Sequence, residues 1–213
     1  MLRATLFSMH SSARASLESA LHNPEFADLT DLPNVRADLR YGSTNNLLAR
    51  DVYEGFQRVL LHRLAAKKFQ RASSLLAARH PSLKFIVFDA LRPQSAQIEF
   101  WNLVKDTPQR PYFADPAKGS LHSYGFSIDL SLIDKNSAEL DMGTPFDDLS
   151  DLAEPRREQE WLAAKRLTKA QIDNRLLLRG VMVDAGFLQL PHEWWHYDAL
   201  PATEVREKFR RLE

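Results

Sequence analysis

The chain has 213 residues, of which 44% are hydrophobic, and this length and composition suit one globular domain with a buried core. Lysine plus arginine and aspartate plus glutamate both number 28, so the formal net charge is zero, which argues against nucleic acid and anionic lipid as partners. The chain has no cysteine, which excludes disulfides and thiolate metal sites but fits the cytoplasm and the periplasm equally well.

The first long element that the sequence predicts is an amphipathic helix from Val52 to His80, where Pro81 follows and ends it. Apolar residues recur there at helical spacing, with charged residues on the opposite side. The aromatic and β-branched run Phe85–Phe88 then predicts a buried strand, because it is too short for a helix. A second helix is expected from Pro93 onward, since proline is tolerated in a first helical turn.

A loop is predicted between Gln109 and Lys118, where prolines occur without helical periodicity. Beyond it, apolar and polar residues alternate from Phe126 to Leu132, which indicates a strand with Asp129 on its polar face. The following stretch, residues 141–154, is acidic and contains glycine and proline, so we expect a solvated loop there.

The last third of the chain carries a clear helix start, because Thr168 and Gln171 have the spacing of a capping box. That helix is expected to end near Gly186, and to be followed by a strand from Phe187 and a short helix from Thr203. Helices alternate irregularly with short strands that are polar on one face. The sequence therefore predicts an α+β fold, a single domain with a mainly antiparallel central sheet and helices packed against it.

Two distant segments, SLHSYGFSIDL and HEWWHYD, together hold the groups that a zinc hydrolase needs. In the first, His122 and Asp129 lie on either side of Gly125, which lets the backbone bend so that both side chains turn toward one point. The second supplies His196 as a third ligand and Glu193 as an acid/base group. Two imidazoles and one carboxylate, with a fourth position for water, are typical of catalytic zinc, whereas structural zinc usually takes cysteines.

The string His-Glu-x-x-His at residues 192–196 raises the alternative of a helical metalloprotease, in which both histidines bind zinc. That arrangement needs a helix to bring residues four apart onto one face. Pro191 precedes the string, and the aromatic residues within the string favour extended structure. We therefore expect His192 either to have no role in the site or to contact a zinc ligand without binding zinc itself.

Ordered blocks of the chain resemble the D-alanyl-D-alanine dipeptidases, a family of zinc peptidases grouped with D,D-carboxypeptidases and similar in fold to the hedgehog signalling domain. The blocks are Asp38–Tyr41 with Asn45 and Asn46, Asp89–Pro93, Ser120–Leu130, Met142–Asp147 and Glu193–His196. The resemblance implies zinc-dependent hydrolysis of D-alanyl-D-alanine or a related D-amino-acid dipeptide. It also implies a zinc D,D-dipeptidase domain over residues 26–213, an N-terminal extension over residues 1–25, and a bacterial cytoplasmic location with the periplasm as the alternative.

Position by position, the resemblance makes His122, Asp129 and His196 the ligands of one zinc ion. It implies that Glu193 is the general base and that Arg92 faces the oxyanion. Losing one oxyanion donor typically costs about 10²- to 10³-fold in turnover. From the sequence, Arg92→Ala is therefore expected to remove turnover without unfolding the chain.

The resemblance also implies how a dipeptide is held. Tyr41 and Asp147 would hold its free ammonium, and Ser120 would suit its carboxylate end. Three positions depart from the family pattern, namely Leu91 in place of tyrosine, Tyr124 in place of arginine and Ser127 in place of alanine. These departures touch no ligand but bear on substrate preference.

Two alternatives stay open on the sequence alone. A D,D- or L,D-carboxypeptidase would act on longer cell-wall peptides through an open cleft, whereas a dipeptidase must hold both ends of its substrate. Asp147 together with Tyr41 favours the dipeptide. A non-catalytic zinc module that binds a partner would need neither Glu193 nor Arg92, since neither is required merely to hold zinc.

Overall fold

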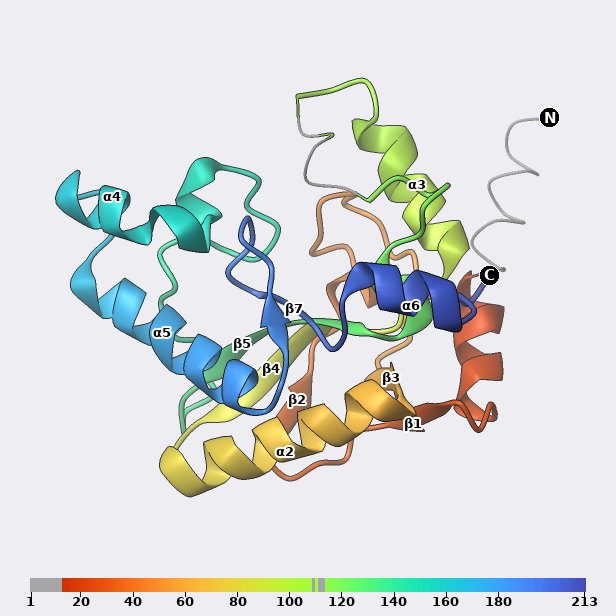
Figure 1. The fold of residues 1–213 in the computed structure, drawn as a ribbon, viewed down its shortest axis with the longest axis horizontal. Coiled ribbons are helices and arrows are strands. Elements are labelled where there is room, and N and C mark those ends of the chain that lie inside the picture. The colour runs from red at the N-terminus through yellow and green to blue at the C-terminus, as the bar shows by residue number, and fades with distance from the viewer. Residues whose placement is uncertain (1–12, 109, 111–113) are drawn as a thin grey trace.

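The computed structural model describes residues 13–108, 110 and 114–213. A five-stranded sheet crosses the molecule in the order β2-β4-β5-β7-β6 (Figure 1). Its strands are Val35–Ala37 (β2), Lys84–Asp89 (β4), Ser127–Ile133 (β5), His196–Asp198 (β7) and Leu188–Gln189 (β6). β2 runs parallel to β4, and the other three pairings are antiparallel. The predicted single α+β domain with a mainly antiparallel sheet is confirmed.

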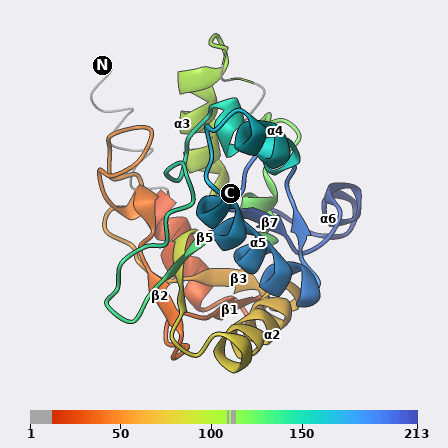
Figure 2. The ribbon, with the colours of Figure 1, turned by 90° about the vertical axis from the view of Figure 1, so that its left-hand side faces the viewer.

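Helices lie around this sheet (Figure 1). They are α2 (Arg63–Arg79), α3 (Gln94–Val104), α4 (Glu158–Ala163), α5 (Lys169–Asp184) and α6 (Ala202–Lys208). Helices α2 and α5 pack side by side on one face of the sheet (Figures 1 and 2). A second sheet pairs β1 (Phe26–Asp28) antiparallel with β3 (Leu60–His62), directly before α2. Short 3₁₀ turns are Arg40–Gly42 (η1), Leu121–Tyr124 (η3), Asp151–Ala153 (η4) and Pro155–Arg157 (η5).

The first long helix begins at Arg63, so the prediction that it starts at Val52 is wrong. The residues between them form turns and then strand β3. Glu54 has a φ of 50° and Gly55 a φ of 73°, and both values lie outside the right-handed helical region. His62 caps the true start, because its Nδ1 accepts a hydrogen bond from the amide of Leu64 at 3.3 Å.

The acidic stretch 141–154 is packed against the domain, so the expectation of a solvated loop is wrong for much of it. Its buried residues are Met142, Thr144, Ala153 and Glu154. The fully buried Arg175 of α5 donates to the carbonyl oxygens of Met142 at 2.7 Å and Leu152 at 3.1 Å. One guanidinium thus holds both ends of the loop that carries Asp147.

Other expected elements are present at or near their predicted bounds. Thr168 Oγ1 accepts from the amide of Gln171 at 3.2 Å and Gln171 Oε1 from that of Thr168 at 2.8 Å, which confirms the capping box of α5. The loop predicted for Gln109–Lys118 lies partly outside the described residues, and residues 114–118 form no helix. Helix α4 and strands β1, β2 and β3 were not predicted.

The described N-terminal segment is helical over residues 13–21, and Leu17 and Ala20 join the main hydrophobic core. Arg14 from the same segment donates to the carbonyl oxygen of Glu54 at 2.7 Å. Within the part of the chain that the structure describes, no helix is both long and apolar enough to cross a membrane.

Candidate active site

A cavity of about 220 Å³ lies beside β5 and β7. All eight residues that the sequence singled out line it, namely Tyr41, Arg92, Ser120, His122, Asp129, Asp147, Glu193 and His196. The volume is below the range of drug-sized ligand pockets, which begins at about 300 Å³, and suits a small substrate. Residues from five separate sequence blocks therefore meet in one place.

The local backbone explains how the first segment presents its two ligands. His122 lies in η3, and Gly125 ends that turn in the left-handed conformation with a φ of 71°. A Cβ on Gly125 would lie 2.7 Å from the amide nitrogen of His62, so both conformation and space require glycine. The chain then enters β5, where Asp129 pairs with His196 of β7, and this pairing brings the distant second segment to the site.

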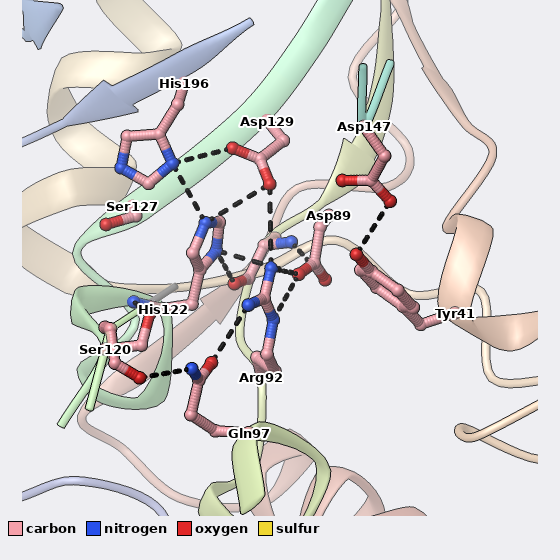
Figure 3. A network of polar contacts seen from close by, with 12 residues as sticks. Tyr41, Asp89, Arg92, Gln97, Ser120, His122, Ser127, Asp129, Asp147 and His196 are labelled. Carbon is pink, nitrogen blue, oxygen red and sulfur yellow. Dashed lines mark hydrogen bonds and ion pairs between the residues drawn. The ribbon is translucent and has the colours of Figure 1, made fainter. Parts of the chain in front are cut away.

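Three side chains converge on one point (Figure 3). Asp129 Oδ1 lies 2.8 Å from His196 Nδ1, and Asp129 Oδ2 lies 3.3 Å from His122 Nε2. His122 Nε2 and His196 Nδ1 are 3.2 Å apart. One ligand atom from each of the three residues lies within 4.8 Å of the other two. This is the only such His/Asp/Glu group with metal-site geometry among residues 13–108, 110 and 114–213.

The outer hydrogen bonds of the two histidines fix which nitrogens face the centre as acceptors. His122 Nδ1 lies 2.7 Å from the carbonyl oxygen of Ala90, and His196 Nε2 lies 2.9 Å from Asp198 Oδ1, so both of these nitrogens carry the proton and donate. The inner nitrogens then point their lone pairs at each other and at Asp129. A divalent cation satisfies this donor set, and two imidazoles with one carboxylate are typical of zinc.

The charges on and around the trio also favour a bound cation. Burial opposes the charged form of His196, but Asp198 and Asp129 outweigh it and raise its pKa well above the ordinary value. Burial likewise opposes ionisation of Asp129, yet His122 and His196 hold the pKa of this carboxyl well below its usual range. The three side chains are therefore arranged around an ionised carboxylate and a centre that favours a cation.

Arg92 lies three residues beyond the end of β4 and is held facing the trio. Its Nε donates to Asp89 Oδ2 at 2.7 Å, its Nη1 to Gln97 Oε1 at 3.0 Å, and its Nη2 lies 3.7 Å from Asp129 Oδ2. Asp89 is completely buried and also accepts from the hydroxyl of Tyr53 at 3.0 Å. The orienting roles of Asp89 and Gln97 were missed, although Asp89 lies in the same sequence block as Arg92.

Asp147 and Tyr41 form a separate acidic end of the cavity, where the hydroxyl of Tyr41 donates to Asp147 Oδ2 at 2.8 Å. Figure 3 shows this pair on one side of His122 and Arg92, and Ser120 on the other. Burial raises the pKa of Asp147 to about 7. Both ends of a small substrate can therefore meet protein groups while its middle faces the trio.

Glu193 is another acid of the cavity, and its side chain is 12% exposed. Its Oε2 lies 3.9 Å from His196 Nδ1, and burial raises its pKa to about 8. Residues 192–195 are not helical, and His192 does not line the cavity but lies 3.8 Å from Glu154 through its Nδ1. The helical metalloprotease arrangement is therefore absent from this segment.

Ser127 occupies a position where alanine is common in the family that the sequence resembles, and its hydroxyl donates to Asp198 Oδ1 at 2.5 Å. The same oxygen accepts from His196 Nε2. Serine at position 127 therefore adds a hydrogen bond to Asp198, which in turn accepts from His196. This contact could not be read from the sequence. The chain Ser127–Asp198–His196 fixes the orientation of the imidazole.

The raised pKa values of Glu193 and Asp147 predict that stability falls with rising pH. Because the folded-state pKa of Glu193 and of Asp147 lies above the ordinary carboxyl range near pH 4, their contribution is complete below that range and is lost as pH rises through about 7 and 8. We expect chelator-treated protein to lose on the order of 2–4 kcal/mol of unfolding free energy between pH 5.5 and 8.5. Urea titrations measure this, and Glu193→Gln should flatten the profile. Equal slopes for both proteins would contradict the assignment.

Comparison with known proteins agrees with this geometry. The family model described as D-ala-D-ala dipeptidase matches residues 23–212. The chain is 35% identical over 175 residues to the D-alanyl-D-alanine dipeptidase of Escherichia coli strain K12, an alignment that covers 82% of this chain and 84% of that protein. Proteins of the same name from Enterococcus faecalis and Enterococcus faecium are 29% and 30% identical, over 78% and 76% of this chain and 86% and 85% of their own lengths. The chain belongs to the D-Ala-D-Ala dipeptidase family.

Proposed function

We propose that this protein is a zinc-dependent dipeptidase that hydrolyses D-alanyl-D-alanine, or a related D-amino-acid dipeptide, into free amino acids. The observation that carries the proposal is the convergence of two imidazoles, the acids Asp129 and Glu193 and one buried guanidinium in a cavity of about 220 Å³. The names of the relatives supply the substrate class.

His122, Asp129 and His196 would hold the zinc ion, which when bound polarises the scissile carbonyl and lowers the pKa of water to about 7. The hydrogen bonds from the outer histidine nitrogens to Ala90 and Asp198 hold a proton on each outer nitrogen, so that in the neutral imidazoles the inner nitrogens are the ones that can bind zinc.

Glu193 acts as the general base and then as the general acid. It takes a proton from the attacking water and returns it to the leaving amine, for which it must begin ionised. Its Oε2 lies 3.9 Å from His196 Nδ1, so it is close enough to the trio to exchange a proton with the reacting groups. Arg92 stabilises the negative charge that develops on the carbonyl oxygen, and Asp89 and Gln97 hold its guanidinium in place beforehand.

Asp147 and Tyr41 bind the free ammonium of the substrate, and Ser120 lies at the end that takes the carboxylate. This arrangement favours a dipeptide over the longer cell-wall peptides of a carboxypeptidase, because the ammonium would lie at a fixed distance from the scissile bond. Arg175 supports it by holding both ends of the loop that carries Asp147.

Blocking the substrate amine tests this preference. We expect N-acetyl-D-Ala-D-Ala to be cleaved at least about a hundredfold more slowly than D-Ala-D-Ala, because the acetyl group removes the positive charge with which Asp147 would pair. Release of D-alanine measures both reactions. Equal rates would move the protein to the carboxypeptidases, and no chelator-sensitive hydrolysis of any dipeptide would favour a non-catalytic zinc module.

We further propose the cytoplasm of a bacterium as the location, with the periplasm as the alternative, and residues 26–213 as the zinc D,D-dipeptidase domain behind an extension of residues 1–25. The match of the family model from residue 23 onward supports this division. The balanced charge supports a small dipeptide as the partner, and not nucleic acid or a membrane.

A further inference from the structure

The proposed roles leave the carboxylate of a dipeptide without a positively charged partner. Ser120 is neutral, and the cavity contains four acidic residues, namely Asp129, Asp147, Glu193 and Asp198. A carboxylate that enters such a cavity loses hydration and meets like charges, so binding requires a cation beside it. This cation must lie at the Ser120 end, because Asp147 and Tyr41 occupy the other side (Figure 3).

Arg92 is not available for this task. Its Nε and Nη2 lie 2.7 Å and 2.6 Å from Asp89 Oδ2, and its Nη1 donates to Gln97 at 3.0 Å. It is buried beside the trio, with its Nη2 3.7 Å from Asp129 Oδ2, where its proposed role is to stabilise the oxyanion. A substrate carboxylate at this guanidinium would displace the reacting bond from the centre.

Arg206 of α6 lines the same cavity and fits the requirement. Its Nη2 donates to the carbonyl oxygen of Gly119 at 3.0 Å, which places the guanidinium next to Ser120. Among the residues that the structure describes, this carbonyl is its only hydrogen-bond partner, so the remaining N–H groups can bind an anion. Gly119 itself is constrained, with a φ of 76° and the ring of Tyr124 3.0 Å from where a Cβ would lie.

We infer that Arg206 binds the C-terminal carboxylate of the substrate together with Ser120. Guanidinium groups recognise carboxylates with two parallel hydrogen bonds, which adds orientation to charge. The two ends of the cavity then carry opposite charge, and a zwitterionic dipeptide spans it with its peptide bond at the trio. The inference rests on the proposed dipeptidase function and narrows its substrates to those with a free α-carboxylate.

Steady-state kinetics with D-Ala-D-Ala and its C-terminal amide, D-Ala-D-alaninamide, test this inference. Arg206→Gln is expected to raise KM for D-Ala-D-Ala at least about tenfold with kcat nearly unchanged, because the carboxylate loses its charged hydrogen-bond partner. It should not change the KM of the amide, which has no carboxylate to lose. Arg206→Lys should fall between, because it keeps the charge but not the planar fork. Arg210→Gln removes an exposed arginine that does not line the cavity and is the matched control.

Equal losses on the acid and the amide in Arg206→Gln would overturn the inference, since they would show a structural effect. A wild-type protein that cleaves the acid and the amide equally well would overturn it too, and would leave the dipeptidase function standing. A wild-type protein that cleaves neither would refute the proposed function and the inference together. Thermal unfolding of each variant establishes that the kinetics compare folded proteins.

Discussion

Replacing Glu193 with glutamine is expected to lower kcat by about 10²- to 10⁴-fold, because glutamine cannot take and return the proton of the attacking water. Stability should not fall, since burial already disfavours the ionised carboxyl and raises its pKa to about 8. Steady-state turnover of D-Ala-D-Ala, with the zinc content and the urea unfolding of the same preparation, measures the effect.

Glu139→Gln provides a matched control for this variant. Burial raises the pKa of Glu139 as well, but Glu139 does not line the cavity. The control should keep wild-type turnover. Near-native kcat in Glu193→Gln at normal zinc content would remove Glu193 from the proposed mechanism.

Arg92→Ala is expected to lower kcat by about 10²- to 10³-fold, the usual cost of one oxyanion donor. The structure adds a second effect that the sequence did not predict. Asp89 is completely buried and would lose its charged partner, and breaking such a buried pair typically costs about 3–5 kcal/mol. The expectation of lost turnover without lost stability is therefore revised.

The double variant Arg92→Ala/Asp89→Asn separates the two effects. It removes the unpaired charge, so we expect urea unfolding to show recovered stability while kcat stays low. Recovery of turnover together with stability would show that Arg92 serves the fold and not the oxyanion.

The candidate metal-binding trio could be predicted from the sequence because its members lie in two compact segments. Gly125 in one segment permits the left-handed turn that the structure shows, and the alternating pattern around Asp129 indicates a strand. Asp129 of β5 then pairs with His196 of β7, and this pairing brings the candidate ligands of the two segments together. Local pattern and tertiary arrangement agree at these positions.

The supporting residues could not be predicted, because their roles depend on contacts between distant elements. Arg175 looks like one more helical arginine until α5 packs against the loop of Asp147. Arg206 similarly appears as one of several basic residues near the end of the chain, and only the packing of α6 places it at the cavity. The start of helix α2 was predicted too early for a related reason. The spacing of apolar residues does not distinguish the turns and strand before Arg63 from the helix itself.

Anomalous diffraction at the zinc edge from crystals grown with zinc tests most directly whether one cation is held by the trio. We predict a single peak per chain within about 2.0–2.2 Å of His122 Nε2, His196 Nδ1 and an oxygen of Asp129. A map without a peak at this point, or with zinc bound by other residues such as His192, would contradict the proposed site.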